Sequence, residues 1–196
     1  MALKMVIPKG QLWNKVFAQF LKKIQKEGMQ TGFFATEHIL PLLAENGQEK
    51  LAYDLLLQEN CPGWMYQVKH GATTTWERWD ALRPDGTVNE SKVADDNMVS
   101  FNHYSFGSVG KFYYQHILGI RPIEAGYKKI RICPYVDKRL GAVSGSYKSR
   151  AGEIKVAWRY EGNKIHMEIE VPTDAEIRLP DKTIREVKSG QYSYVC

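Results

Sequence analysis

The chain has 196 residues, a formal net charge of +5, 43% apolar residues and 12% aromatic residues. This composition is typical of a globular protein with one large or two small domains, and it excludes a fibrous or largely disordered chain. Lysine and arginine are spread along the chain in short runs such as Lys22-Lys23, whereas a surface that follows nucleic-acid phosphates needs clustered cations. We therefore expect no nucleic-acid partner.

The cysteines and the apolar segments exclude further classes. Cys61, Cys133 and Cys196 are odd in number and far apart, so they predict neither a disulfide framework nor a metal site, and we expect no cofactor. No apolar segment reaches the length of a membrane span, and the run before Pro8 is too short for a signal peptide. We expect no membrane partner and a cytoplasmic location for the chain as given. For a truncated chain, which can lose an export signal, the location would be unknown.

Apolar periodicity predicts three helices, at residues 11–28, 36–46 and 48–59. Pro41 is interpreted as early enough in the second helix to be tolerated there. Short helices joined by short loops favour antiparallel helical hairpins. The side chains predicted to face the core are Leu12, Trp13, Val16, Phe17, Phe20, Leu21, Ile24, Ile39, Leu42, Leu43, Leu51, Leu55 and Leu56.

Residues 71–86 include two indole rings, two carboxylates and a guanidinium group within five positions. Indole rings can stack on the apolar face of a sugar while charged groups bond its hydroxyls, so this stretch favours a sugar site. The alternative is a capping box at a helix start, because Thr74 and Glu77 stand three apart. From the pattern alone the capping box is favoured, since such boxes are common. The residues concerned are Trp76, Glu77, Arg78, Trp79 and Asp80.

Beyond this stretch, residues 89–98 are polar and acidic and predict a loop. Its Asp95-Asp96-Asn97 run lacks the ligand spacing of a calcium loop. A fourth helix is predicted at residues 104–118, packed through Val109, Phe112, Tyr113 and Ile117, with Ser100 or Asn102 as its cap. Residues 119–122 are interpreted as a joint between domains.

From Tyr127 onward the apolar period changes from nearly four to two. Residues 153–160 and 165–171 alternate as strands, with Glu161-Gly162-Asn163 as a hairpin turn. Shorter strands are predicted around Ile130, Val143, Ile177, Ile184 and Tyr194. The region is most simply a small all-β sandwich, so the fold class is α+β with more than one domain.

Five segments, taken together and in order, resemble the C-terminal portion of bacterial α-L-rhamnosidases of glycoside hydrolase family 78. The resemblance covers nearly the whole chain. The segments are Thr31-Gly32-Phe33, Leu40-Pro41-Leu42-Leu43-Ala44-Glu45-Asn46-Gly47, Trp64-Met65-Tyr66-Gln67-Val68, Thr73-Thr74-Thr75-Trp76-Glu77-Arg78-Trp79-Asp80 and Ser100-Phe101-Asn102-His103-Tyr104.

The resemblance implies a fold and an activity. Residues 1–121 would form part of an (α/α)6 toroid of paired helices around an active-site funnel, and residues 122–196 would form a β-sandwich. The implied activity is the inverting hydrolysis of terminal α-L-rhamnosides in a glycan or glycoside. Inversion needs a carboxylic acid that protonates the leaving oxygen and a carboxylate that activates water on the opposite face of the sugar.

By resemblance, Glu77 is the water-activating base and His103 contacts the rhamnose hydroxyls. The alternative for His103 is a histidine at a helix start, bonded to a backbone carbonyl. Trp64, Trp76 and Trp79 would form the walls of the sugar subsite. The alternative is that they pack in the core, as aromatic residues in a helical domain do equally often.

Asp80 is a poor candidate for the acid. Positions three apart on a helix put Cβ atoms about 5–6 Å apart on one face, whereas an inverting pair stands about 6.5–9.5 Å apart across the sugar. We expect Asp80 to pair with Arg78, Arg83 or a backbone donor.

The general acid of the family lies in an upstream motif that this sequence does not contain. We therefore expect the chain alone to be weak or inactive, a C-terminal fragment that carries the base without the acid. A partial toroid also leaves apolar helix faces uncovered, which predicts a homo-oligomer through the open helical face or pairing with an upstream-encoded half. The alternative is a non-catalytic carbohydrate-binding or interaction module derived from such an enzyme.

Overall fold

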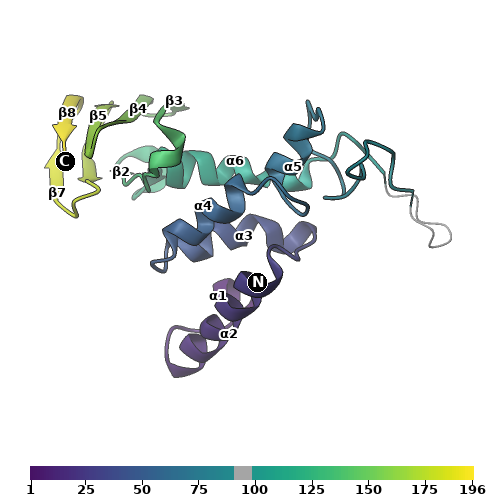
Figure 1. Ribbon diagram of the computed structural model, residues 1–196. Coiled ribbons are helices and arrows are strands. Elements are labelled where there is room, and N and C mark those ends of the chain that lie inside the picture. Colours follow the sequence, from purple (N-terminus) through teal and green to yellow (C-terminus); the bar gives the residue numbers. More distant parts are fainter. Residues whose placement is uncertain (91–98) are drawn as a thin grey trace. The chain divides into compact units, whose positions relative to one another are not determined.

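The computed structural model describes residues 1–90 and 99–196, which form two compact units, residues 1–109 and 110–196. The first unit is helical and the second is built mainly of strands (Figure 1). A helical portion followed by β-sheets confirms the α+β expectation in its coarse form. The predicted domain boundary between residues 121 and 122 stays a prediction. Of the predicted acidic loop, residues 91–98 lie outside the described residues.

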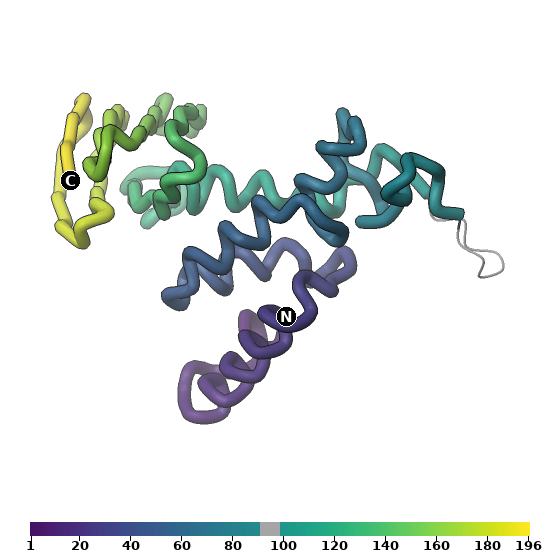
Figure 2. Tube along the Cα trace, viewed as in Figure 1, coloured from purple at the N-terminus to yellow at the C-terminus, as the bar shows by residue number. Residues whose placement is uncertain are grey.

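The helical unit begins with five helices whose path Figure 2 traces. α3 and α4 pack against each other after the short connection 45–48, as expected for a helical hairpin. None of the helices in residues 1–90 and 99–196 combines the length and the apolar character needed to cross a bilayer. The five helices are α1 (Ala2–Met5), α2 (Gln11–Glu27), α3 (Phe33–Ala44), α4 (Glu49–Leu57) and α5 (Trp64–Lys69).

The predicted limits of α2 are confirmed, but the predicted burial of its apolar stripe is wrong in part. Trp13 and Ile24 are buried, whereas Leu12 is 62% exposed and Phe17 and Phe20 are only half-buried. Trp13 is fixed because its Nε1 donates to the Leu3 carbonyl at 2.8 Å in α1. Helical period alone places these side chains on one face, but burial also needs a partner surface.

α3 begins earlier than predicted, at Phe33, which places Pro41 in the helix interior and makes the interpretation of Pro41 as an early residue wrong. The missing N–H of Pro41 is tolerated one turn before the helix ends at Ala44. Ile39, Leu42 and Leu43 are buried as predicted. In α4, Leu55 and Leu56 are buried as predicted, and Leu51 is half-buried.

The helix predicted at residues 104–118 is a helical segment of changing pitch. It runs through η1 (Ser105–Ser108), α6 (Val109–Phe112) and the π-helical η2 (Tyr113–Ile117). Two predictions about it are wrong. Tyr113 is 42% exposed rather than buried, and neither Ser100 nor Asn102 caps the segment. The Ser100 hydroxyl instead accepts from the Asn102 N–H at 3.2 Å, closing a local turn.

The second unit contains two four-stranded sheets, in the orders β1-β2-β6-β7 and β3-β4-β5-β8. β2 and β6 are parallel, and the pairs β3–β4, β4–β5 and β5–β8 are antiparallel. All five predicted short strands and the hairpin turn after Glu161 are confirmed. The strands are β1 (Ile120–Pro122), β2 (Ile130–Ile132), β3 (Ala142–Ser149), β4 (Gly152–Glu161), β5 (Lys164–Val171), β6 (Ala175–Arg178), β7 (Ile184–Val187) and β8 (Gly190–Val195); η3 (Ala125–Tyr127) and η4 (Lys138–Leu140) connect them.

Alternation along β4 and β5 builds the core of this unit. Val156 lies opposite Ile169 and Trp158 opposite Met167, and all four are buried. The indole Nε1 of Trp158 donates to the Ile117 carbonyl at 2.9 Å, so its polar atom is satisfied inside the core. Strand alternation therefore puts one face of this sheet inward and leaves the other face to solvent.

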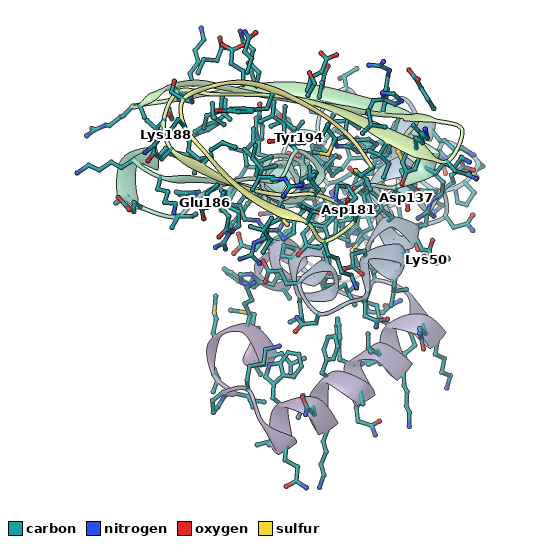
Figure 3. The ribbon with its side chains drawn as sticks, turned by 90° about the vertical axis from the view of Figure 1, so that its left-hand side faces the viewer. Lys50, Asp137, Asp181, Glu186, Lys188 and Tyr194 are labelled. Carbon is teal, nitrogen blue, oxygen red and sulfur yellow. The ribbon has the colours of Figure 1, made fainter. Side chains whose placement is uncertain are left out.

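The smaller sheet carries a charge cluster around Glu176. The Glu176 carboxylate accepts from Arg131 Nε at 2.6 Å and from Arg178 Nε at 2.7 Å, and its side chain is 14% exposed. Hydrogen bonds from Arg178 and then from Arg131 hold the pKa of Glu176 below its ordinary value. Glu186 and Lys188, labelled in Figure 3, make separate and more exposed ion pairs.

Glu176→Gln should lower the free energy of unfolding by about 1 kcal/mol at neutral pH, because both arginines lose a charged acceptor. The loss is modest because water partly screens both ion pairs. A depressed pKa stabilises the fold above the ordinary pKa of a glutamate, and this stabilisation is lost as pH falls through the depressed value. Urea unfolding at neutral and at acidic pH should therefore show the difference between variant and wild type shrinking in acid.

The matched control is Asp174→Asn, which removes the exposed pair with Lys188 and should cost less than about 0.5 kcal/mol. An equal loss in the two variants, or a Glu176→Gln difference that persists in acid, would contradict this account.

Candidate active site

Two segments far apart in the sequence are bonded to each other in the helical unit. The Glu77 N–H donates to the Ser100 carbonyl at 2.9 Å, and the His103 N–H donates to the Thr75 carbonyl at 2.8 Å. The Thr75 hydroxyl returns a bond to the His103 carbonyl at 2.6 Å. These bonds bring Glu77 and His103 to neighbouring positions.

The capping-box interpretation of Thr74 and Glu77 is wrong, because no helix starts there. The Thr74 hydroxyl donates to the Phe101 carbonyl instead. Pairing with residues 100–103 satisfies the polar backbone that a helix would have satisfied locally.

The Glu77 carboxylate is anchored by one oxygen. Oε2 accepts from the Ser100 N–H at 3.1 Å, and Oε1 lies 3.9 Å from His103 Nε2. The side chain is 14% exposed. It lines a hollow of about 420 Å³ together with Phe33, Trp79 and other residues of the helical unit. Glu77 therefore points into a cavity of the size typical of small-molecule sites.

The His103 ring is held by stacking and by one hydrogen bond. Phe33 stacks on it at a centroid distance of 4.8 Å, and Tyr104 at 5.0 Å. Its Nδ1 accepts from the Ser105 N–H at 3.3 Å, which leaves the proton of the neutral ring on Nε2, toward Glu77. The alternative of a bond to a backbone carbonyl is therefore wrong, since the ring nitrogen accepts a backbone N–H.

The three tryptophans occupy different environments. Trp79 lines the hollow, stacks on Phe106 at 3.7 Å and donates from Nε1 to the Thr31 carbonyl at 3.0 Å. Trp76 is 2% exposed and packs in a core cluster with Tyr66, and Trp64 is 6% exposed. Burial of Trp76 and Trp64 supports the packing alternative for these two residues, while Trp79 faces the space that a ligand would fill.

Asp80 pairs with Arg78, as expected. The guanidinium makes two bonds to the carboxylate, Nε to Oδ1 and Nη2 to Oδ2, each 3.1 Å long. The Asn89 amide also donates to Oδ2 at 2.6 Å. These three hydrogen bonds from Arg78 and Asn89 hold the Asp80 carboxylate in an ion pair beside the hollow.

α5 positions the segment that carries Glu77, a role that the sequence analysis missed. Gln67 is buried, and its Oε1 accepts from the Trp76 N–H at 3.2 Å, one residue before Glu77. From the same helix, Tyr66 OH donates to the Leu82 carbonyl at 2.7 Å, and Trp64 Nε1 donates to the Phe106 carbonyl at 2.9 Å. A glutamine inside an aromatic segment was the available signal, since a buried amide needs partners.

Among the described residues that line the hollow, Cys61 carries the one thiol. Partial desolvation, and then the Asp80 carboxylate, raise the pKa of the Cys61 thiol at the edge of the hollow, so Cys61 stays a weak nucleophile. Within the described part of the chain, no three histidine, cysteine or acidic side chains gather as metal ligands would.

Comparison with protein families identifies the chain. Residues 1–117 match the bacterial α-L-rhamnosidase six-hairpin glycosidase domain, and residues 119–193 match the bacterial α-L-rhamnosidase C-terminal domain. The chain belongs to the bacterial α-L-rhamnosidase family, which confirms the resemblance drawn from its sequence motifs.

Curated relatives support the assignment. An α-L-rhamnosidase of Formosa agariphila is 36% identical over 174 residues, covering 87% of this chain and 18% of the relative. An α-L-rhamnosidase of Streptomyces avermitilis is 36% identical over 154 residues, covering 78% of this chain and 14% of the relative. The chain thus spans less than a fifth of the length of these relatives.

Solved structures show the same fold over almost all of the chain. The crystal structure of Streptomyces avermitilis α-L-rhamnosidase complexed with L-rhamnose matches with a TM-score of 0.90 and 29% identity, covering 100% of this chain and 21% of that protein. Native α-L-rhamnosidase from Aspergillus terreus matches with a TM-score of 0.87 and 31% identity, covering 96% of this chain and 22% of that protein.

Gln67→Leu should lower the free energy of unfolding by about 1–3 kcal/mol, because the buried Trp76 N–H loses its acceptor. Amide hydrogen exchange at Trp76 should rise as well, and this local readout separates loss of the bond from a general loss of packing. The control is Gln19→Leu on the exposed face of α2, with an expected change within about 0.5 kcal/mol. Unchanged exchange at Trp76 would contradict the positioning role of Gln67.

Proposed function

We propose that the chain is part of an inverting α-L-rhamnosidase that hydrolyses terminal α-L-rhamnosides, with Glu77 as the general base. The observation that carries this proposal is the state of the Glu77 carboxylate. Ser100 holds Oε2, while Oε1 has no hydrogen-bond partner among the described residues, and Glu77 lines the same hollow as Trp79. An anchored carboxylate with one open oxygen can orient a water molecule and take its proton.

In this proposal, water held by Glu77 Oε1 attacks the anomeric carbon, its proton passes to the carboxylate, and the glycosidic oxygen leaves on the opposite side of the sugar. His103 would contact the rhamnose hydroxyls near the attacking water from its place beside Oε1. Trp79 would form an aromatic wall of the subsite. Trp76 and Trp64 support this arrangement from the core.

The proton donor for the leaving oxygen is proposed to come from outside this chain. Among the described residues that line the hollow, the only other carboxylate is Asp80, which is bonded to Arg78 and Asn89. We propose that the helical unit is part of an (α/α)6 toroid whose remaining hairpins carry the acid, and that the two sheets of the second unit form a sandwich. The two family matches and the short span of the chain against its relatives support this.

The chain alone should hydrolyse 4-nitrophenyl α-L-rhamnoside at least about a hundredfold more slowly than a full-length relative, because half of the acid–base pair is missing. Addition of a polypeptide encoded upstream that contains the acid should restore turnover, and Glu77→Gln should abolish the restored activity. The readout is release of 4-nitrophenol.

The control for this assay is Glu59→Gln, an exposed glutamate paired with Lys69, which should leave the restored activity unchanged. Full activity of Glu77→Gln in the complemented assay would overturn the assignment of the base. L-rhamnose binding with no turnover under any condition would favour the non-catalytic module.

The exposed stripe of α2 is proposed to mediate self-association or pairing with the missing half. Leu12 is 62% exposed, and Phe17 and Phe20 on the same helix are only half-buried. An apolar stripe of this kind favours association.

Light scattering should show the wild type as a dimer or larger at high concentration, and Leu12→Glu should shift it toward monomer. Gln19→Glu adds the same charge at an exposed position of α2 and should not change the size of the particle. A monomeric wild type at high concentration would contradict the proposal.

A further inference from the structure

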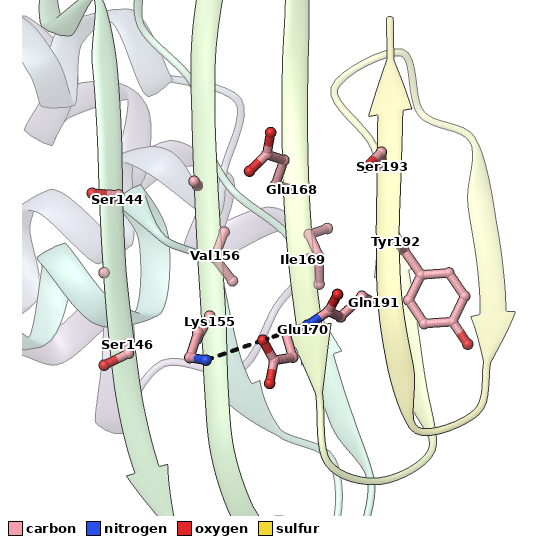
Figure 4. A pocket seen from close by; sticks show the side chains of 12 residues that line it. Ser144, Ser146, Lys155, Val156, Glu168, Ile169, Glu170, Gln191, Tyr192 and Ser193 are labelled. Carbon is pink, nitrogen blue, oxygen red and sulfur yellow. Dashed lines mark hydrogen bonds and ion pairs between the residues drawn. The ribbon is translucent and has the colours of Figure 1, made fainter.

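The solvent-facing side of the sheet β3-β4-β5-β8 is a polar hollow. Register places Ser144, Ala157, Glu168 and Ser193 in one row across the four strands. These residues alternate with buried neighbours such as Val156, so they share the outward face. The hollow along this face has a volume of about 530 Å³ (Figure 4).

Charged side chains flank this row on both sides along the strands, and their charges are paired. On one side, Lys155 Nζ and Gln191 Nε2 both donate to Glu170 Oε2 at 3.1 Å, as Figure 4 shows for these neighbours. On the other side, Glu161 bonds Arg159 Nε at 2.8 Å and lies 3.0 Å from His166 Nε2. The two groups of residues that flank the row therefore carry little uncompensated charge.

The centre of the hollow has free hydrogen-bonding capacity, in contrast to the flanking residues. The Glu168 side chain is 71% exposed, and its Oε1 lies 3.8 Å from Arg159 Nη1, beyond hydrogen-bonding distance. The hydroxyls of Ser144 and Ser193 have no hydrogen-bond partner within residues 1–90 and 99–196. Ala157 lies between these two serines in the row, and its small methyl group forms the floor of the hollow without filling the space above the strand.

We propose that this face of the β unit binds a neutral oligosaccharide. A ligand with many hydroxyls matches a row of open serine hydroxyls beside an exposed carboxylate, since the serine hydroxyls both donate and accept and the carboxylate accepts from the sugar hydroxyls. The charges of the flanking rows are paired, and the exposed Glu168 carboxylate between them repels an anionic ligand. The volume lies within the range of small-molecule sites, and the outward row lets a chain of sugars extend across the strands.

This binding site is separate from the Glu77 hollow and does not depend on the proposed hydrolysis. Every residue named for it belongs to the second unit, whereas Glu77 belongs to the first. A carbohydrate bound here would add affinity for a polymeric substrate.

The test is an NMR titration of the full 196-residue chain with rhamnotriose and cellotriose, and with trigalacturonate as an anionic counterpart. At least one neutral trisaccharide should shift the amide signals of Ser144, Ala157 and Ser193 with a Kd of about 1 mM or below. Glu168→Gln should weaken that binding about tenfold through loss of a charged acceptor. Ala157→Phe should abolish it by filling the floor.

Glu186→Gln is the matched control, because Glu186 is an exposed strand glutamate of the other sheet and the variant should bind as the wild type does. Three results would overturn the inference: no shifts with either neutral trisaccharide, a preference for trigalacturonate, or shifts confined to residues around Glu77. Unchanged affinity in Ala157→Phe would overturn it too.

Discussion

The hydrogen bonds between residues 74–77 and 100–103 are the constraint on which the candidate active site depends. They fix two loops that contain no helix or strand. One of these hydrogen bonds, from the Ser100 N–H, holds a carboxylate oxygen of Glu77. Gln67, from α5, holds the adjoining Trp76 N–H from the buried side. Glu77 is thereby fixed in position while its second oxygen stays open, which is the pre-organisation that a general base needs.

The β unit depends on a different constraint, the period-two alternation of β4 and β5. Inward side chains such as Trp158 and Met167 form the core, and the same alternation leaves Ala157 and Glu168 facing solvent. One sequence pattern therefore specifies both the stability of the sheet and the polar hollow on its outer face. The proposed base and the proposed oligosaccharide site thus rest on separate physical grounds, one on non-local loop pairing and one on strand register.

Sequence patterns predicted what is local. The strands, the hairpin after Glu161 and the Arg78–Asp80 pair were predictable because each involves residues close together in the chain. Non-local effects were not predictable. Thr74 and Glu77 have the spacing of a capping box, yet both bond to residues more than twenty positions away, and Leu12 is exposed because burial needs a partner surface that periodicity does not supply. The proximity of Glu77 to His103 follows from the same long-range pairing, so only the family resemblance linked them beforehand.

The most direct test of the central claim is a titration of the chain with L-rhamnose, followed through the indole N–H signal of Trp79 and the ring signals of His103. Both sets of signals should move with one common dissociation constant, because Trp79 lines the same hollow as Glu77 and the His103 ring lies 3.9 Å from Glu77 Oε1. If rhamnose binds while both sets of signals stay in place, the hollow beside Glu77 is not the sugar site.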